Sequence, residues 1–115
     1  MGVPTSSDRQ PSVARRDGNR LLLEGTVTVE TVPTLLEEGR AQLRDGADTI
    51  DFGAVTEVDS AAVALAIAWL REARAAGRTL RFVNPPPALQ NLARLYAVND
   101  LIPFAAEARS AAQGR

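Results

Sequence analysis

The side chains able to do chemistry are few, and the most distinctive of them is a serine. Ser60 directly follows Asp59 and stands before Ala61–Leu70, a run with no charged residue. Serine is a common N-cap, so its hydroxyl is expected to accept a hydrogen bond from a free N–H at the start of a helix. A phosphate on the same hydroxyl would bring roughly −1.5 to −2 charges to the positive end of that helix. Ser60 is therefore predicted to be a helix cap that also serves as a docking point or a switch.

Most catalytic and metal chemistry is excluded, because the chain contains neither histidine nor cysteine. Zinc sites built from these residues cannot form, and no imidazole is available to activate a serine nucleophile. Glu57 and Asp59 stand close together with no third acidic ligand beside them, and Asp51 is interpreted as an acceptor that orients a loop. We therefore expect no catalytic residue, no metal and no cofactor, and we predict an interaction module rather than an enzyme.

The overall composition is that of one ordinary globular domain. The chain has 115 residues, of which 45% are hydrophobic and 23% are charged, and its formal net charge is -1. Such a balance leaves no basic surface for nucleic acid. The longest uncharged apolar run, Ala61–Leu70, is about half of the length that crosses a membrane. We expect a cytoplasmic protein that neither binds nucleic acid nor spans the membrane.

Alternating strand and helix patterns would position Ser60. The predicted strands are Ser12–Arg16 and Arg20–Glu24, joined through Asp17-Gly18 as a hairpin, then Thr49–Phe52, Thr79–Val83 and a short Leu101-Ile102. The predicted helices are one from Val32 to Leu43 with Thr31 as its N-cap, Ser60–Ala76, one capped by Asn84, and an alanine-rich helix near the C-terminal end. Because strand–helix–strand connections make parallel neighbours, the predicted fold class is α/β, with helices packed against a mixed sheet of about four to five strands.

The predicted elements form a single domain with two short ends. Residues 12–106 are expected to fold together. Residues 1–11 carry Pro, Ser, Thr and Gly without periodicity and are expected to be a flexible N-terminal tail. Residues 107–115 are expected to be the end of the C-terminal helix and a tail.

The predicted helix Ser60–Ala76 is unusually apolar. At about 100° per residue, one side collects three large residues, which we take as the core face. These residues are Val63, Ile67 and Leu70. Leu65 and Trp69 fall on roughly the opposite side, and a helix that is apolar all round must be covered all round. Leu65 and Trp69 are therefore predicted to contact a partner protein, the alternative being that Trp69 packs under the neighbouring helix.

Three stretches of the chain together resemble a known family. They are the hairpin ending in Leu23-Glu24-Gly25, the strand Ile50-Asp51-Phe52, and Val58-Asp59-Ser60-Ala61-Ala62-Val63 at the start of a helix. In this order and spacing they resemble the STAS domain over residues 12–106. The segment Asn91–Ile102, which follows Arg81-Phe82-Val83-Asn84, is similar to the MlaB branch of that family. More distantly, the chain resembles anti-sigma-factor antagonists.

The resemblance implies a STAS-like fold and a function without catalysis. MlaB-like STAS domains are cytosolic subunits of a phospholipid ABC transporter, where they bind and support an MlaF-like ATPase subunit. Such a protein would lie at the inner membrane only through its partner and would help to maintain outer-membrane lipid asymmetry. The resemblance implies a partner-binding site at the start of the helix. The predicted partner contacts of Leu65 and Trp69 extend this site along the helix. The residues of the site are Asp59, Ser60, Ala61, Ala62, Leu65 and Trp69.

The more distant resemblance implies a different role for the same serine. In an anti-sigma-factor antagonist, Ser60 would be the phosphorylated residue, and the partner would be an anti-sigma factor kinase. Docking and phosphorylation therefore remain two alternatives for Ser60.

Overall fold

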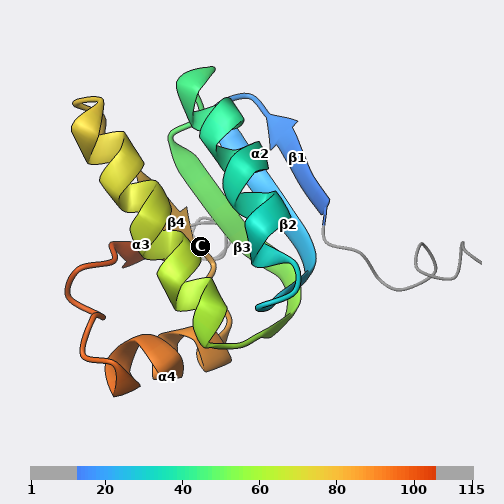
Figure 1. The fold of residues 1–115 in the computed structure, drawn as a ribbon, viewed down its shortest axis with the longest axis vertical. Coiled ribbons are helices and arrows are strands. Elements are labelled where there is room, and N and C mark those ends of the chain that lie inside the picture. Colours follow the sequence, from blue (N-terminus) through green and yellow to red (C-terminus); the bar gives the residue numbers. More distant parts are fainter. Residues whose placement is uncertain (1–12, 106–115) are drawn as a thin grey trace, which may run out of the picture.

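One five-stranded sheet lies at the centre of the molecule, in the order β1-β2-β3-β4-β5. The computed structural model describes residues 13–105. Its strands are β1 (Val13–Asp17), β2 (Arg20–Val27), β3 (Thr49–Val58), β4 (Arg81–Val83) and β5 (Phe104–Ala105). Its helices are α2 (Val32–Arg44), α3 (Ser60–Ala75) and α4 (Pro87–Leu95). Figure 1 shows α2 and α3 side by side in front of the sheet, with α4 near the end of α3 at which that helix begins.

The sheet is mixed, as predicted. Strand β1 pairs with β2 in the antiparallel direction, and the other three neighbouring pairs are parallel. The antiparallel pair is a tight hairpin in which Asp17 pairs with Arg20, so that the loop is Gly18-Asn19. Gly18 has a φ of 66°, which suits a glycine in a two-residue hairpin loop because it has no Cβ to clash. The predicted α/β class, with a mixed sheet and helices packed against it, is confirmed.

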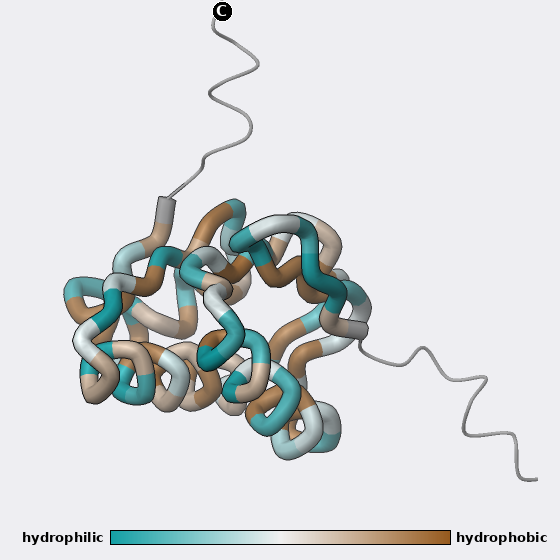
Figure 2. The backbone as a smooth tube through the Cα atoms, turned by 90° about the horizontal axis from the view of Figure 1, so that it is seen from above, coloured by the Kyte–Doolittle hydropathy of each residue, from teal (hydrophilic) through white to brown (hydrophobic). Residues whose placement is uncertain are grey.

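The core lies between the sheet and the helices. Leu21, Ile50 and Phe82 are neighbours across the three central strands, and all three are fully buried. Phe82 also stacks on Phe52 with a centroid distance of 6.1 Å. In Figure 2 the helical coils are banded, because hydrophobic and hydrophilic residues alternate along each turn. This pattern turns one side of each helix toward the buried face of the sheet.

Helices α2 and α3 are held together by a tryptophan packed against a glycine. Trp69 of α3 is 0% exposed, and its indole N–H donates a hydrogen bond to the Leu36 carbonyl at 3.2 Å. A Cβ placed on Gly39 of α2 would lie 2.3 Å from the indole atoms. The absence of a side chain at position 39 therefore creates the space that the indole fills.

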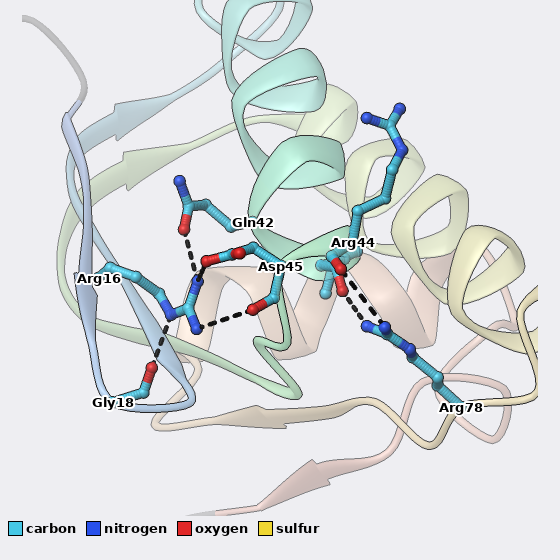
Figure 3. Close-up of polar contacts among 7 residues, drawn as sticks. Arg16, Gly18, Gln42, Arg44, Asp45 and Arg78 are labelled. Carbon is cyan, nitrogen blue, oxygen red and sulfur yellow. Dashed lines mark hydrogen bonds and ion pairs between the residues drawn. The ribbon is translucent and has the colours of Figure 1, made fainter.

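Two arginines from other elements bind the C-terminal end of α2 (Figure 3). Arg16 of β1 donates to the Gln42 side chain at 2.6 Å and forms an ion pair with Asp45 at 3.3 Å. Arg78, which follows α3, donates to the carbonyl oxygens of Leu43 and Arg44. The last carbonyls of a helix lack intrahelical partners and carry partial negative charge, so guanidinium groups stabilise them.

Some predicted boundaries are wrong. Strand β3 does not end before Gly53 but continues to Val58, because it stays paired with β2 through two register shifts. The last strand is not Leu101-Ile102: Ile102 is buried in the core, and the pairing begins at Phe104. Thr31 occupies the N-cap position of α2, but its side chain makes no capping bond. The predicted N-terminal tail and the C-terminal helix lie outside the described residues.

We predict that Gly39→Ala lowers the free energy of unfolding by about 2 kcal/mol, because overpacking a filled site costs about that much. The sign is informative, since Gly→Ala inside a helix normally stabilises by up to about 1 kcal/mol. Urea unfolding followed by far-ultraviolet circular dichroism measures the change.

A double variant gives the control for this prediction. Trp69→Leu alone should destabilise the protein, and Gly39→Ala combined with it should cost less than the sum of the two single changes. Additive losses would show that the two positions do not share one space.

Candidate functional site

Ser60 is the first residue of α3, and its side chain is exposed. Ser60 was predicted to be the N-cap of this helix, but the N-cap is Asp59. Asp59 has an extended backbone, with φ -134° and ψ -170°, and its Oδ1 accepts a hydrogen bond from the Ala61 N–H at 2.8 Å. Sequence alone could not choose between two adjacent residues that both cap well. Because Asp59 does the capping, the Ser60 hydroxyl is left facing solvent.

The second carboxylate oxygen of Asp59 reaches a different element. Asp59 Oδ2 accepts from the backbone N–H of Val29 at 3.0 Å, in the turn between β2 and α2. Val29 itself is 67% exposed. One side chain therefore joins the start of α3 to the turn before α2, and both of its oxygens are occupied within the chain. Asp59 organises the surface around Ser60 rather than offering a free charge on it.

A shallow apolar groove lies beside Ser60. It is lined by one stripe of α3 and by residues that follow α4, and its volume is about 380 Å³. We call this feature the Ser60 groove, and its residues are Ser60, Val63, Ala64, Ile67, Tyr96 and Val98. Tyr96 is 51% exposed, and Leu95 and Leu101, near it in the chain, are 73% and 49% exposed. Large exposed apolar residues gathered at one place are typical of protein contact sites.

The prediction that Leu65 and Trp69 form a partner-facing surface is wrong. Leu65 is 1% exposed and Trp69 0%, and both belong to the core between the helices and the sheet. The alternative for Trp69, packing under the neighbouring helix, is the arrangement observed. A helical wheel fixes the angles between side chains but not which side faces the sheet. The space for the indole is provided by Gly39 of α2. The sequence of α3 alone therefore does not indicate that Trp69 is buried.

The other predicted binding residues divide between surface and core. Ala61 is half-buried, while Ala62 is 0% exposed and cannot touch a partner in this structure. Ser60 remains the exposed member of the group. The residues from the end of α4 onward were not predicted to bind a partner, although their run of large apolar side chains was an available signal. These residues are Leu95, Tyr96, Val98 and Leu101.

Asp51 orients a loop, as interpreted from the sequence. Its Oδ1 accepts from the Gly53 N–H at 2.8 Å and from the Asn84 side-chain amide at 3.1 Å. Its Oδ2 accepts from Arg20 at 3.0 Å, an ion pair between β2 and β3. The prediction that Asn84 caps α4 is wrong: three prolines follow it, and Pro86 takes the N-cap position. The Asn84 amide bonds to the sheet instead.

Within residues 13–105, no group of three or more acidic side chains is placed to hold a metal ion. Glu30, Glu57 and Asp59 border a shallow depression beside the turn before α2. No helix among the described residues is long and apolar enough to cross a membrane.

We predict that Asp59→Ala destabilises the protein by about 1–2 kcal/mol, the usual cost of losing an N-cap. Asp59→Asn should cost much less, because an amide oxygen still caps the helix. Hydrogen exchange of the Ala61 and Val29 amides measures both bonds. Both amides should exchange faster in Asp59→Ala. In Asp59→Asn the Ala61 amide should stay protected while the Val29 amide exchanges faster, because the side-chain amide has a single acceptor oxygen. Unchanged protection of Val29 would contradict the second role of Asp59.

The fold is shared with solved structures of low sequence identity. An anti-sigma factor antagonist from Mycobacterium paratuberculosis is 17% identical, with 98% of this chain and 97% of that chain covered and a TM-score of 0.67. A putative anti-sigma factor antagonist from Thermotoga maritima is 13% identical, with 89% and 92% covered and a TM-score of 0.68. The Bacillus cell fate determinant SpoIIAA in its phosphorylated form is 18% identical, with 90% and 99% covered and a TM-score of 0.60. At such identities the likeness shows the fold alone.

The sequence itself matches a family. No curated protein matches the chain. The family model described as "Mlab, STAS domain" matches residues 12–103, which include Asp59, Ser60 and the whole Ser60 groove. STAS domains are generally non-catalytic binding domains that act through contacts with other proteins. The chain therefore belongs to the STAS family, in the group described as Mlab.

Proposed function

We propose that this STAS domain is a non-catalytic accessory subunit of a phospholipid-transporting ABC system. It binds the MlaF-like ATPase subunit on the cytoplasmic side of the inner membrane and supports its activity, and the system maintains outer-membrane lipid asymmetry. The observation that carries the proposal is the match of the Mlab family model to residues 12–103.

The docking face in this proposal is the exposed surface around Ser60. The Ser60 hydroxyl can donate or accept a hydrogen bond, and the adjoining Ser60 groove offers an apolar recess for a partner side chain. Tyr96 lines this groove, and both Tyr96 and the adjacent Leu95 are exposed. They supply apolar area of the kind found at the centre of protein contacts. Asp59 acts indirectly, by fixing the start of α3 against the turn that carries Val29.

Copurification with an MlaF-like ATPase subunit from the same organism tests the docking face. We predict that Ser60→Glu weakens binding at least tenfold, because a carboxylate would have to be desolvated in the contact. Tyr96→Ala should weaken binding to a similar degree by removing a large contact. Isothermal titration measures both affinities, and the ATPase rate of the complex should fall with them.

The matched control is Thr79→Glu, which places the same charge on an exposed residue beyond the opposite end of α3. It should bind the ATPase as the wild type does. If Ser60→Glu and Tyr96→Ala both bind like this control, the docking face lies elsewhere on the domain. If the wild type itself does not bind the ATPase, the transporter role is wrong.

A second candidate function is that of an anti-sigma-factor antagonist switched by phosphorylation of Ser60 by an anti-sigma factor kinase. The likeness to SpoIIAA, solved in its phosphorylated form, and the exposure of the Ser60 hydroxyl favour this alternative. A phosphate there would be stabilised by the free N–H groups of the first turn and repelled by Asp59.

Mass spectrometry of the protein purified from its own cells separates the two functions. For a transporter subunit we expect unmodified Ser60 at all growth stages. Stoichiometric phosphoserine at position 60 that disappears with a serine kinase would favour the antagonist, and a phosphatase-treated sample provides the control.

A further inference from the structure

Helix α4 is bounded by two residues with an unusual backbone. Asn84 precedes it with a φ of 55° and Ala97 follows it with a φ of 59°. Within residues 13–105 these are the only non-glycine residues with positive φ. A Cβ makes this conformation costly, although asparagine tolerates it better than most residues do. Such residues persist only where the surroundings hold them in place.

Asn84 is held by its side chain. Its amide N–H donates to Asp51 Oδ1 at 3.1 Å, and the same oxygen accepts from the Gly53 N–H. Because Arg20 binds the other oxygen of Asp51, the carboxylate is fixed on two sides. The Asn84 Oδ1 is buried and has no hydrogen-bond partner among the described residues. Burying that atom is unfavourable, so the bond to Asp51 is kept at a cost to stability.

The residues between Asn84 and α4 have a restricted backbone, so the conformation at Asn84 affects the direction of the helix. Pro85, Pro86 and Pro87 follow in sequence, and each proline ring locks φ near −65°. Asn84 is thus the last residue before the helix whose φ is not fixed by a proline ring. Leu89 and Ala93 then bury one side of α4 in the core.

The far end of α4 leads directly to the Ser60 groove. The Ala97 N–H donates to the Arg94 carbonyl at 2.9 Å and the Val98 N–H to the Ala93 carbonyl at 2.8 Å, the pattern of a Schellman C-cap with alanine in place of the usual glycine. This cap places Tyr96 and Val98, which form the α4 side of the groove.

We infer that Asn84, held by Asp51, is a positioning residue of the docking face. It sets the direction of α4, and through the rigid segment from Pro85 to Val98 it sets the distance between Tyr96 and α3. The inference rests on the proposed function for its effect on partner binding, but its effect on the groove is independent of any partner.

The experiment uses Asn84→Gly, because glycine keeps the positive φ without strain and removes only the side-chain bond. Nuclear Overhauser contacts between the Tyr96 ring and the Ile67 methyl groups measure the width of the groove. We expect them to weaken at least twofold, and the affinity for the MlaF-like ATPase subunit to fall about tenfold at a temperature where the variant is fully folded. Asn19→Gly, which removes an asparagine side-chain hydrogen bond to Asp48 beside the β1–β2 turn and away from the Ser60 groove, should leave both quantities unchanged.

Asp51→Asn and Asp51→Ala show whether the bond between the two side chains is responsible. Asp51→Asn keeps an acceptor for the Asn84 amide and should retain the Tyr96 contacts. Asp51→Ala should weaken these contacts as Asn84→Gly does. Asp51→Ala combined with Asn84→Gly should weaken them no more than either single change.

Each result supports or overturns the inference. Weakened contacts in Asn84→Gly support it. Contacts that persist in Asn84→Gly overturn it, even if the variant is less stable, because Asn84 would then contribute only to folding. If the wild type does not bind the ATPase, the proposed function fails, and the Tyr96 contacts alone still decide whether Asn84 positions the groove.

Discussion

The contact between Trp69 and Gly39 determines which side of α3 faces the core. The indole occupies the volume that a side chain at position 39 would take, and its N–H is satisfied by the Leu36 carbonyl. With Trp69 turned inward, the stripe of α3 that remains outside begins at Ser60 and continues through Ala64. The surface proposed for docking is thus a consequence of how α2 and α3 pack, and the large apolar area of the tryptophan stabilises that choice.

The two ends of the α2 and α3 layer are stabilised in opposite ways. At the C-terminal end of α2, Arg16 donates a hydrogen bond to the Asp45 carbonyl, and Arg78 donates to the carbonyls of Leu43 and Arg44. At the N-terminal end of α3, the Asp59 carboxylate binds free N–H groups of two different segments. Both arrangements follow from the helix dipole. The exposed Val29 and the exposed Ser60 lie at the Asp59 end, which makes this end the functional one in our proposal.

Membership of the STAS family narrows the function without choosing one partner. The same fold occurs in anti-sigma factor antagonists that share less than a fifth of their residues with this chain, so the fold alone does not assign a role. What distinguishes the two roles physically is the state of one hydroxyl. A neutral Ser60 beside an apolar groove suits a permanent contact, whereas a phosphorylated one would carry extra charge next to Asp59.

The sequence by itself determined the order of the elements and the place of Ser60 at the start of a helix. These features depend on local signals: the Asp-Gly turn of the hairpin, and apolar spacing within each helix. Only the tertiary structure decided that Leu65 and Trp69 are buried, that Asp59 rather than Ser60 caps α3, and that Tyr96 borders a groove. Each of these depends on a residue distant in the chain, such as Gly39 for the indole or Val29 for the second oxygen of Asp59. A local pattern limits which contacts a side chain can make, but the partner that it meets is set by how the elements pack.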